Sequence, residues 1–172
     1  MMISVAHLAR FSAPARLARI GVMVAMTALV AACASNSTTD PNAAGLGGAN
    51  TPGSVAEFQS ASVGDRVFFD TDSSEINAQG QAILERQASW LNRYTRYSFT
   101  LEGHADERGT REYNFALGAR RAEAVKNYLV ARGISSARIR TMSYGKERPV
   151  ATCDDISCWS QNRRVQTVLS GG

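Results

Sequence analysis

Apolar and polar side chains alternate between residues 97 and 103. One face of this stretch carries Tyr97, Phe99 and Leu101, and the other carries Ser98, Thr100 and Glu102. A period of two predicts a β-strand with one buried face. Between residues 111 and 131 the period lengthens to three and four, which predicts an amphipathic helix that ends before Gly133. The apolar stripe of this helix consists of Leu117, Ala124, Val125, Tyr128 and Leu129.

Similar patterns predict the other elements of a single domain between about residues 56 and 170. Another helix is expected at residues 77–94, with a stripe made of Ile83, Gln87, Trp90, Leu91 and Tyr94. Further strands are expected at residues 66–69, 138–144 and 164–169. The order β-α-β-α-β-β predicts an α/β two-layer sandwich, with both helices packed on one face of a mixed four-stranded sheet.

The first 32 residues do not fit this domain. Three arginines precede an apolar run of 13 residues, Ile20–Ala32. A membrane span needs about 20 residues, so this run predicts a signal peptide. The run ends in Leu-Val-Ala-Ala-Cys, which resembles the bacterial lipobox and implies cleavage before Cys33 and lipidation of Cys33. An ordinary signal peptide followed by a chance cysteine is the alternative. Ala34 follows, where an aspartate would indicate inner-membrane retention, so the outer membrane is favoured.

Residues 34–54 are rich in Gly, Asn, Ser, Thr, Ala and Pro and have no period. This composition predicts a flexible tether after the lipidated Cys33, with an extended reach of about 70 Å. The folded domain is therefore expected at residues 55–172. Such a tether would allow the lipid and the domain to be attached to different structures.

Removal of the leader changes the charge of the chain. The whole sequence has a net charge of +4, but three of its 19 basic residues and none of its 15 acidic residues lie in the first 32 positions. The remainder has a net charge of +1. No basic run with interleaved aromatic residues remains to indicate nucleic-acid binding.

The junction between the alternating strand and the following helix contains the candidate site. Asp106 follows the strand, and strand–helix junctions of α/β folds hold ligands. Arg121 falls on the apolar stripe together with Asn114, whereas Arg120 is rotated by about 100° toward solvent. A buried unpaired charge is costly, so Arg121 needs an anionic partner. The partner is either Asp106 or Glu102 in an internal salt bridge, or the carboxylate of a zwitterion whose ammonium Asp106 holds.

Cys153 and Cys158 remain if Cys33 is acylated, and they lie in the loop before the last strand. In an oxidising compartment this pair predicts a structural disulfide, whereas a redox-active pair is more often Cys-x-x-Cys. His104 and Asp106 are only two possible metal ligands, and no third has a recognisable spacing, so no metal site is predicted.

Four segments, FFDTDSSEI, LEGHADERGTREYNFALGARRAEAV, SYGKERP and NRRV, follow the lipobox and tether in this order. They resemble the peptidoglycan-associated lipoproteins of Gram-negative bacteria, whose folded part is an OmpA-like peptidoglycan-binding domain. The resemblance covers residues 67–169. It implies a protein that is not an enzyme, has no cofactor, and binds the meso-diaminopimelate of the peptidoglycan stem peptide non-covalently. The cysteine pair is a departure, because these lipoproteins commonly lack it.

Matching the family motif residue by residue implies the roles of the site residues. Asp106 would pair with the ammonium of diaminopimelate, and Arg121 would make a two-bond contact with its carboxylate. Asn114, Asp70 and Arg163 would also belong to the pocket. Alternatively, Asp70 is a helix-cap acid and Arg163 is a solvated residue at a strand end.

The resemblance also implies partners. These are peptidoglycan, a TolB-type periplasmic propeller protein with the other Tol components, and the outer membrane, reached through the lipid. The expected role is to join the outer membrane to the cell wall and to help draw it inward during division. Two rival functions remain: a peptidoglycan hydrolase using His104 and Asp106, for which no nucleophile motif is present, and a structural lipoprotein with an internal Asp106–Arg121 salt bridge.

Overall fold

A four-stranded sheet forms the framework of residues 51–171, the part of the chain that the computed structural model describes. The strands are β1 (Arg66–Phe68), β2 (Ser98–His104), β3 (Ile139–Gly145) and β4 (Arg164–Ser170), in the spatial order β1-β4-β2-β3. β4 runs antiparallel to both of its neighbours, and β2 pairs with β3 in parallel. The predicted mixed sheet is therefore confirmed. The predictions for Cys33 and the signal peptide lie outside the described residues.

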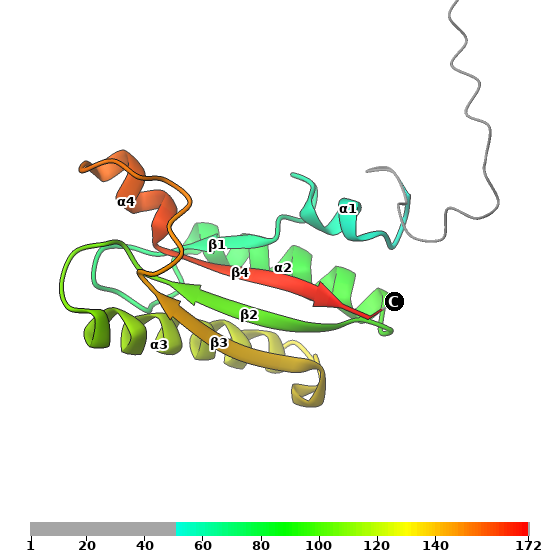
Figure 1. Cartoon of the computed structure of the whole chain (residues 1–172). Helices are drawn as coiled ribbons and strands as arrows, with labels where there is room; N and C mark the ends of the chain where they lie inside the picture. The colour runs from blue at the N-terminus through cyan, green and yellow to red at the C-terminus, as the bar shows by residue number, and fades with distance from the viewer. Residues whose placement is uncertain (1–50, 172) are drawn as a thin grey trace, which may run out of the picture. The chain divides into compact units, whose positions relative to one another are not determined.

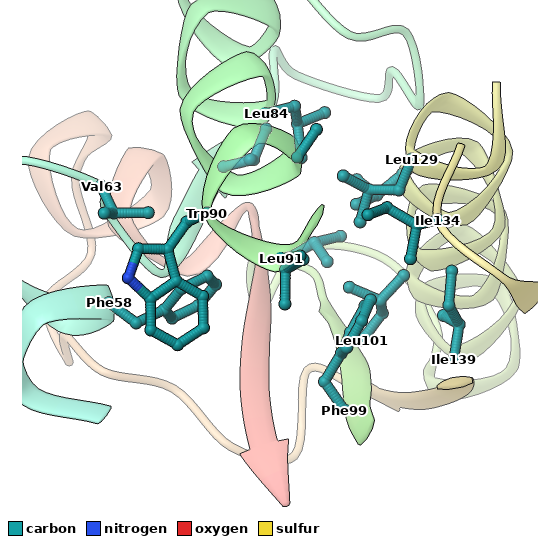
Figure 2. Close-up of a cluster of buried hydrophobic side chains, with 14 of the residues drawn as sticks. Phe58, Val63, Leu84, Trp90, Leu91, Phe99, Leu101, Leu129, Ile134 and Ile139 are labelled. Atoms are coloured by element: carbon teal, nitrogen blue, oxygen red, sulfur yellow. The ribbon is translucent and has the colours of Figure 1, made fainter. Parts of the chain in front are cut away.

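Two long helices, α2 (Ala78–Arg93) and α3 (Arg111–Val130), pack on the same face of this sheet (Figure 1). Leu84 and Leu91 of α2 and Leu129 of α3 meet the β2 residues Phe99 and Leu101 in one apolar cluster (Figure 2). Phe99 and Leu101 are buried because they share one face of the alternating strand, as predicted. The two-layer α/β sandwich is confirmed.

Two short helices were not predicted. α1 (Val55–Gln59) precedes β1, and α4 (Ile156–Asn162) lies in the expected loop before β4 (Figure 1). The carboxylate of Asp155 accepts a hydrogen bond from the backbone N–H of Ser157, which caps the first turn of α4. A 3₁₀ turn (Ser136–Arg138) leads into β3. Within residues 51–171, no helix has the length and apolarity needed to cross a membrane.

The end of the expected tether packs against the domain. Gly53 is buried, and its carbonyl oxygen accepts hydrogen bonds from Arg96 at 2.6 Å and from Tyr97 at 2.8 Å. Its N–H donates to Glu57, which also accepts a hydrogen bond from the indole of Trp90. The ordered domain therefore includes residues before 55, and a soluble fragment that starts at Ala56 would lose these contacts.

A pair of glycines sets the distance between α3 and β2. A Cβ atom on Gly103 would lie 1.9 Å from the backbone oxygen of Gly118, and one on Gly118 would lie 2.5 Å from Ser143 Oγ. Only glycine permits this approach at both positions. Because Arg121 follows Gly118 by one helical turn, the close contact brings its side chain to the end of β2.

Candidate functional site

A cavity of about 260 Å³ opens where β2 ends and α3 begins. Three predicted site residues, Asp106, Asn114 and Arg121, line it together. Sequence reasoning missed the other lining residues, which are Thr71, Asp72, Arg108, Gly109, Tyr113 and Leu117. The structure thus brings together one acid, one amide and one arginine of the predicted set and adds a second arginine.

Arg121 forms part of the cavity wall although its side chain is fully buried. Its Nε donates to the carbonyl of Ser73 at 2.7 Å, Nη1 to that of His104 at 2.9 Å, and Nη2 to that of Asp70 at 3.1 Å. Burial lowers its pKa to about 10, and the nearby positive charge of Arg163 acts in the same direction. Within residues 51–171, no carboxylate forms an ion pair with Arg121.

Asp106 has other partners, so the suggested Asp106–Arg121 or Glu102–Arg121 salt bridge is wrong. Arg108 binds the carboxylate through Nη2 at 2.7 Å and Nε at 3.2 Å, and Arg163 Nη1 lies 3.3 Å from Oδ2. Burial alone would raise the pKa of Asp106. The hydrogen bonds from Arg108 and Arg163 outweigh that effect and hold the pKa below its usual value.

Two of the lining residues make a polar contact between α3 and the loop after β1. The hydroxyl of Tyr113 donates to the carboxylate of Asp72, which lies on the loop after β1. Asp72 has a φ of 56°, an uncommon conformation for a residue other than glycine. Asn114 is buried, and its amide donates to the carbonyl of Arg108 at 2.6 Å, which fixes the loop between β2 and α3.

Asp70 and Arg163 do not line this cavity. The side chain of Asp70 is exposed, and it shares a separate hollow of about 310 Å³ with Arg163. Asp70 contributes to the site through its carbonyl, which accepts from Arg121. Arg163 is only 6% exposed and donates to the carbonyl of Phe69 at 3.0 Å, so it is a buried support for Asp106 and not a solvated residue.

His104 is buried, and it is not among the residues that line the cavity. Its ring stacks on Tyr144, with centroids 5.5 Å apart, and neither ring nitrogen has a hydrogen-bond partner among the described residues. Burial lowers its pKa to about 4, and the positive charges of Arg164 and Arg148 act in the same direction. His104 and Asp106 therefore do not form an acid–base pair.

A disulfide joins Cys153 and Cys158, as predicted, with 5.6 Å between their Cα atoms. It holds the start of α4. The guanidinium carbon of Arg108 lies over the ring of Trp159 in this helix, 4.3 Å from the ring centroid. Arg163 directly follows this helix. α4 thus supplies two supports to the Asp106 side of the cavity, and its only local sequence signal is the cap residue Asp155.

The chain resembles known proteins in sequence and in structure. Residues 68–163 match the model of the OmpA family. A peptidoglycan-associated lipoprotein of Rhizobium meliloti is 62% identical over 160 residues, which cover 90% of each chain. The protein of the same name from Pseudomonas aeruginosa is 44% identical over 133 residues, covering 77% of this chain and 79% of that protein.

Solved structures agree with these relatives. The crystal structure of the peptidoglycan-associated lipoprotein from Burkholderia pseudomallei is 40% identical with a TM-score of 0.62, covering 70% of this chain and 98% of that one. The C-terminal domain of Helicobacter pylori MotB is 25% identical with a TM-score of 0.59, covering 63% of this chain and 85% of that one. The predicted resemblance is confirmed, and these relatives agree with the prediction of a protein that is not an enzyme. The chain belongs to the OmpA family.

Proposed function

We propose that this chain is an envelope lipoprotein that binds peptidoglycan non-covalently through the meso-diaminopimelate of the stem peptide. The names of its relatives support the coarser part of this statement, a peptidoglycan-associated lipoprotein. The finer part, the diaminopimelate contact, is supported by the chemistry of the cavity between β2 and α3.

The buried guanidinium of Arg121 carries the proposal. A guanidinium has five N–H donors, and carbonyls accept from one on each of its three nitrogens. One N–H on Nη1 and one on Nη2 remain, and two such donors match the two oxygens of a carboxylate. Because the described residues supply no carboxylate to this cation, a ligand carboxylate would complete the site.

Asp106 provides the second charge of the site. Diaminopimelate carries an ammonium and a carboxylate on the same carbon, and Asp106 and Arg121 line the same small cavity. Its volume of about 260 Å³ suits the end of a side chain and not a whole glycan strand. The amide of Asn114 and the hydroxyl of Tyr113 are polar groups at the same cavity.

The proposal extends to the place of the protein in the envelope. Lipid on Cys33 would anchor the chain in the outer membrane, facing the periplasm, and the residues after it would reach the cell wall. Contact with a TolB-type propeller protein and the other Tol components, and a role in division, are proposed from the family resemblance.

Co-sedimentation with purified sacculi tests the proposal. The chain is prepared as residues 33–172 with Cys33→Ser, so that it is not acylated and keeps the contacts of Gly53. We expect this protein to pellet with sacculi, and Asp106→Ala and Arg121→Ala to remain in the supernatant. Arg120→Ala is the matched control, because it removes an exposed arginine next to Arg121.

A thermal melt of each variant accompanies the assay. If folded Asp106→Ala and Arg121→Ala still pellet like the unmodified protein, the ligand site lies elsewhere. If the unmodified protein itself stays in solution, peptidoglycan is not its ligand.

A further inference from the structure

The carboxylate of Asp106 has no free acceptor position in this structure. A carboxylate has about four lone-pair positions. Oδ1 accepts from the backbone N–H and the Nε of Arg108, both at 3.2 Å. Oδ2 accepts from Arg108 Nη2 at 2.7 Å and from Arg163 Nη1 at 3.3 Å. An incoming ammonium therefore cannot bind Asp106 unless one of these donors leaves.

Arg163 is buried and held by two groups, whereas the Arg108 side chain is partly exposed. The Arg163 side chain is 7% exposed and is also held by the carbonyl of Phe69. The Arg108 side chain is 41% exposed, and besides Asp106 it contacts the face of Trp159. The contact with Trp159 is exposed and weak, and water can reach the Arg108 guanidinium but not that of Arg163, so Arg108 is the donor that can be displaced.

We infer that the Arg108 side chain is a built-in competitor that occupies the ammonium subsite of the cavity, so that ligand binding is an exchange of one cation for another at Asp106. This inference rests on the proposed function. It makes Arg108 a specificity residue. A ligand with a free amine recovers the Asp106 contact when it displaces Arg108, whereas a ligand with only a carboxylate meets a subsite that is already filled.

The exchange predicts that removal of Arg108 strengthens binding. The apparent affinity equals the intrinsic affinity multiplied by the fraction of time that Arg108 is away from Asp106. If Arg108 occupies the subsite for at least about two thirds of the time, Arg108→Ala should bind an amine-bearing ligand at least about threefold more tightly. The probe is the soluble stem tripeptide that ends in meso-diaminopimelate, titrated by calorimetry into residues 33–172 with Cys33→Ser. The same peptide, acetylated on the side-chain amine of its diaminopimelate, should gain no affinity from the Arg108→Ala substitution.

Trp159 gives a second, independent readout. The chain has two tryptophans, and the other, Trp90, is buried in the core. Displacement of Arg108 from the Trp159 ring should change its fluorescence when the tripeptide binds. The acetylated peptide should not cause this change, and the change should be lost in Arg108→Ala. Background from Trp90 is removed with Trp90→Phe.

Matched variants separate this effect from net charge and from misfolding. Arg111→Ala removes an arginine of an exposed ion pair with Glu147 outside the cavity, and its affinity should not change. If Arg108→Ala does not fold, Arg108→Gln takes its place. Weaker or unchanged tripeptide binding by the folded Arg108 variant overturns the exchange and leaves the proposed function standing. An unmodified protein that binds neither sacculi nor tripeptide refutes the proposed function itself.

Discussion

Replacing Arg121 by lysine separates the shape of the buried cation from its charge. The guanidinium donates to the carbonyls of Ser73 and Asp70, which lie in the loop between β1 and α2, and to that of His104 at the end of β2. A lysine ammonium is a compact point charge without the planar fork, so we expect two of these three hydrogen bonds to be lost. At about 1–2 kcal/mol for each one, the free energy of unfolding should fall by about 2–4 kcal/mol.

Urea unfolding followed by circular dichroism measures this loss, with residues 33–172 carrying Cys33→Ser. Arg120→Lys is the control. Arg120 is exposed, and its guanidinium carbon lies 5.9 Å from the centre of the Tyr113 ring, so its replacement should change stability by less than about 0.5 kcal/mol. Sacculus binding by the folded Arg121→Lys protein should weaken about tenfold or more, because lysine cannot make the two-bond carboxylate contact.

Two results would refute this reasoning. If Arg121→Lys unfolds within about 0.5 kcal/mol of the unmodified protein, the three carbonyl contacts do not determine the stability of the site. If it is destabilised but still binds sacculi as well as before, the fork of Arg121 does not contact the ligand.

Three further predictions concern the surroundings of the site. Gly118→Ala places a Cβ 2.5 Å from Ser143 Oγ and 2.8 Å from the Gly103 oxygen, so it should cost about 1–3 kcal/mol in urea unfolding and weaken sacculus binding. A loss below about 0.5 kcal/mol would show that α3 shifts freely. Burial lowers the pKa of His104 from its ordinary 6.5 to about 4, so the unfolded chain takes up a proton in this window that the folded chain does not. Stability should therefore decrease by up to about 3 kcal/mol as the pH falls from 6.5 to 4. His104→Gln, which removes the only histidine after residue 32, should flatten this decrease, and an identical pH profile would contradict the prediction. Removal of the disulfide by Cys153→Ser with Cys158→Ser should lower stability by roughly 2 kcal/mol through loss of a short closed loop and should weaken binding of the tripeptide. Dithiothreitol should reproduce this effect in the unmodified protein and leave the double variant unchanged.

Local periodicity in the sequence determined the elements and the burial of their faces. The alternation around Phe99 and Leu101 identified the core face of β2, and the helical phase separated the buried Arg121 from the exposed Arg120. Both inferences work because side-chain direction repeats every 2 residues in a strand and every 3.6 in a helix, whatever lies opposite. The bounds of the predicted elements differ from the observed ones by at most one residue at each end, which is within the usual uncertainty of helix and strand ends.

Hydrophobic periodicity did not predict the short helices. α4 has seven residues, too few for a hydrophobic period to emerge, and only its cap Asp155 identifies it. Its position is nevertheless decisive for the site, because it brings Trp159 and Arg163 to the side of Asp106.

The sequence by itself thus determined that Asp106 and Arg121 lie near the end of β2, but it did not reveal Arg108 or Asp72, and only the tertiary structure decided which charged groups touch. Asp106 pairs with Arg108 and Arg163, while Arg121 binds the carbonyls of Ser73, His104 and Asp70. The physical reason is that a buried charge takes whichever partners the fold brings within about 3 Å, and those partners come from segments as many as 94 positions away in the chain, as for Arg163 and Phe69. No local pattern encodes such distances.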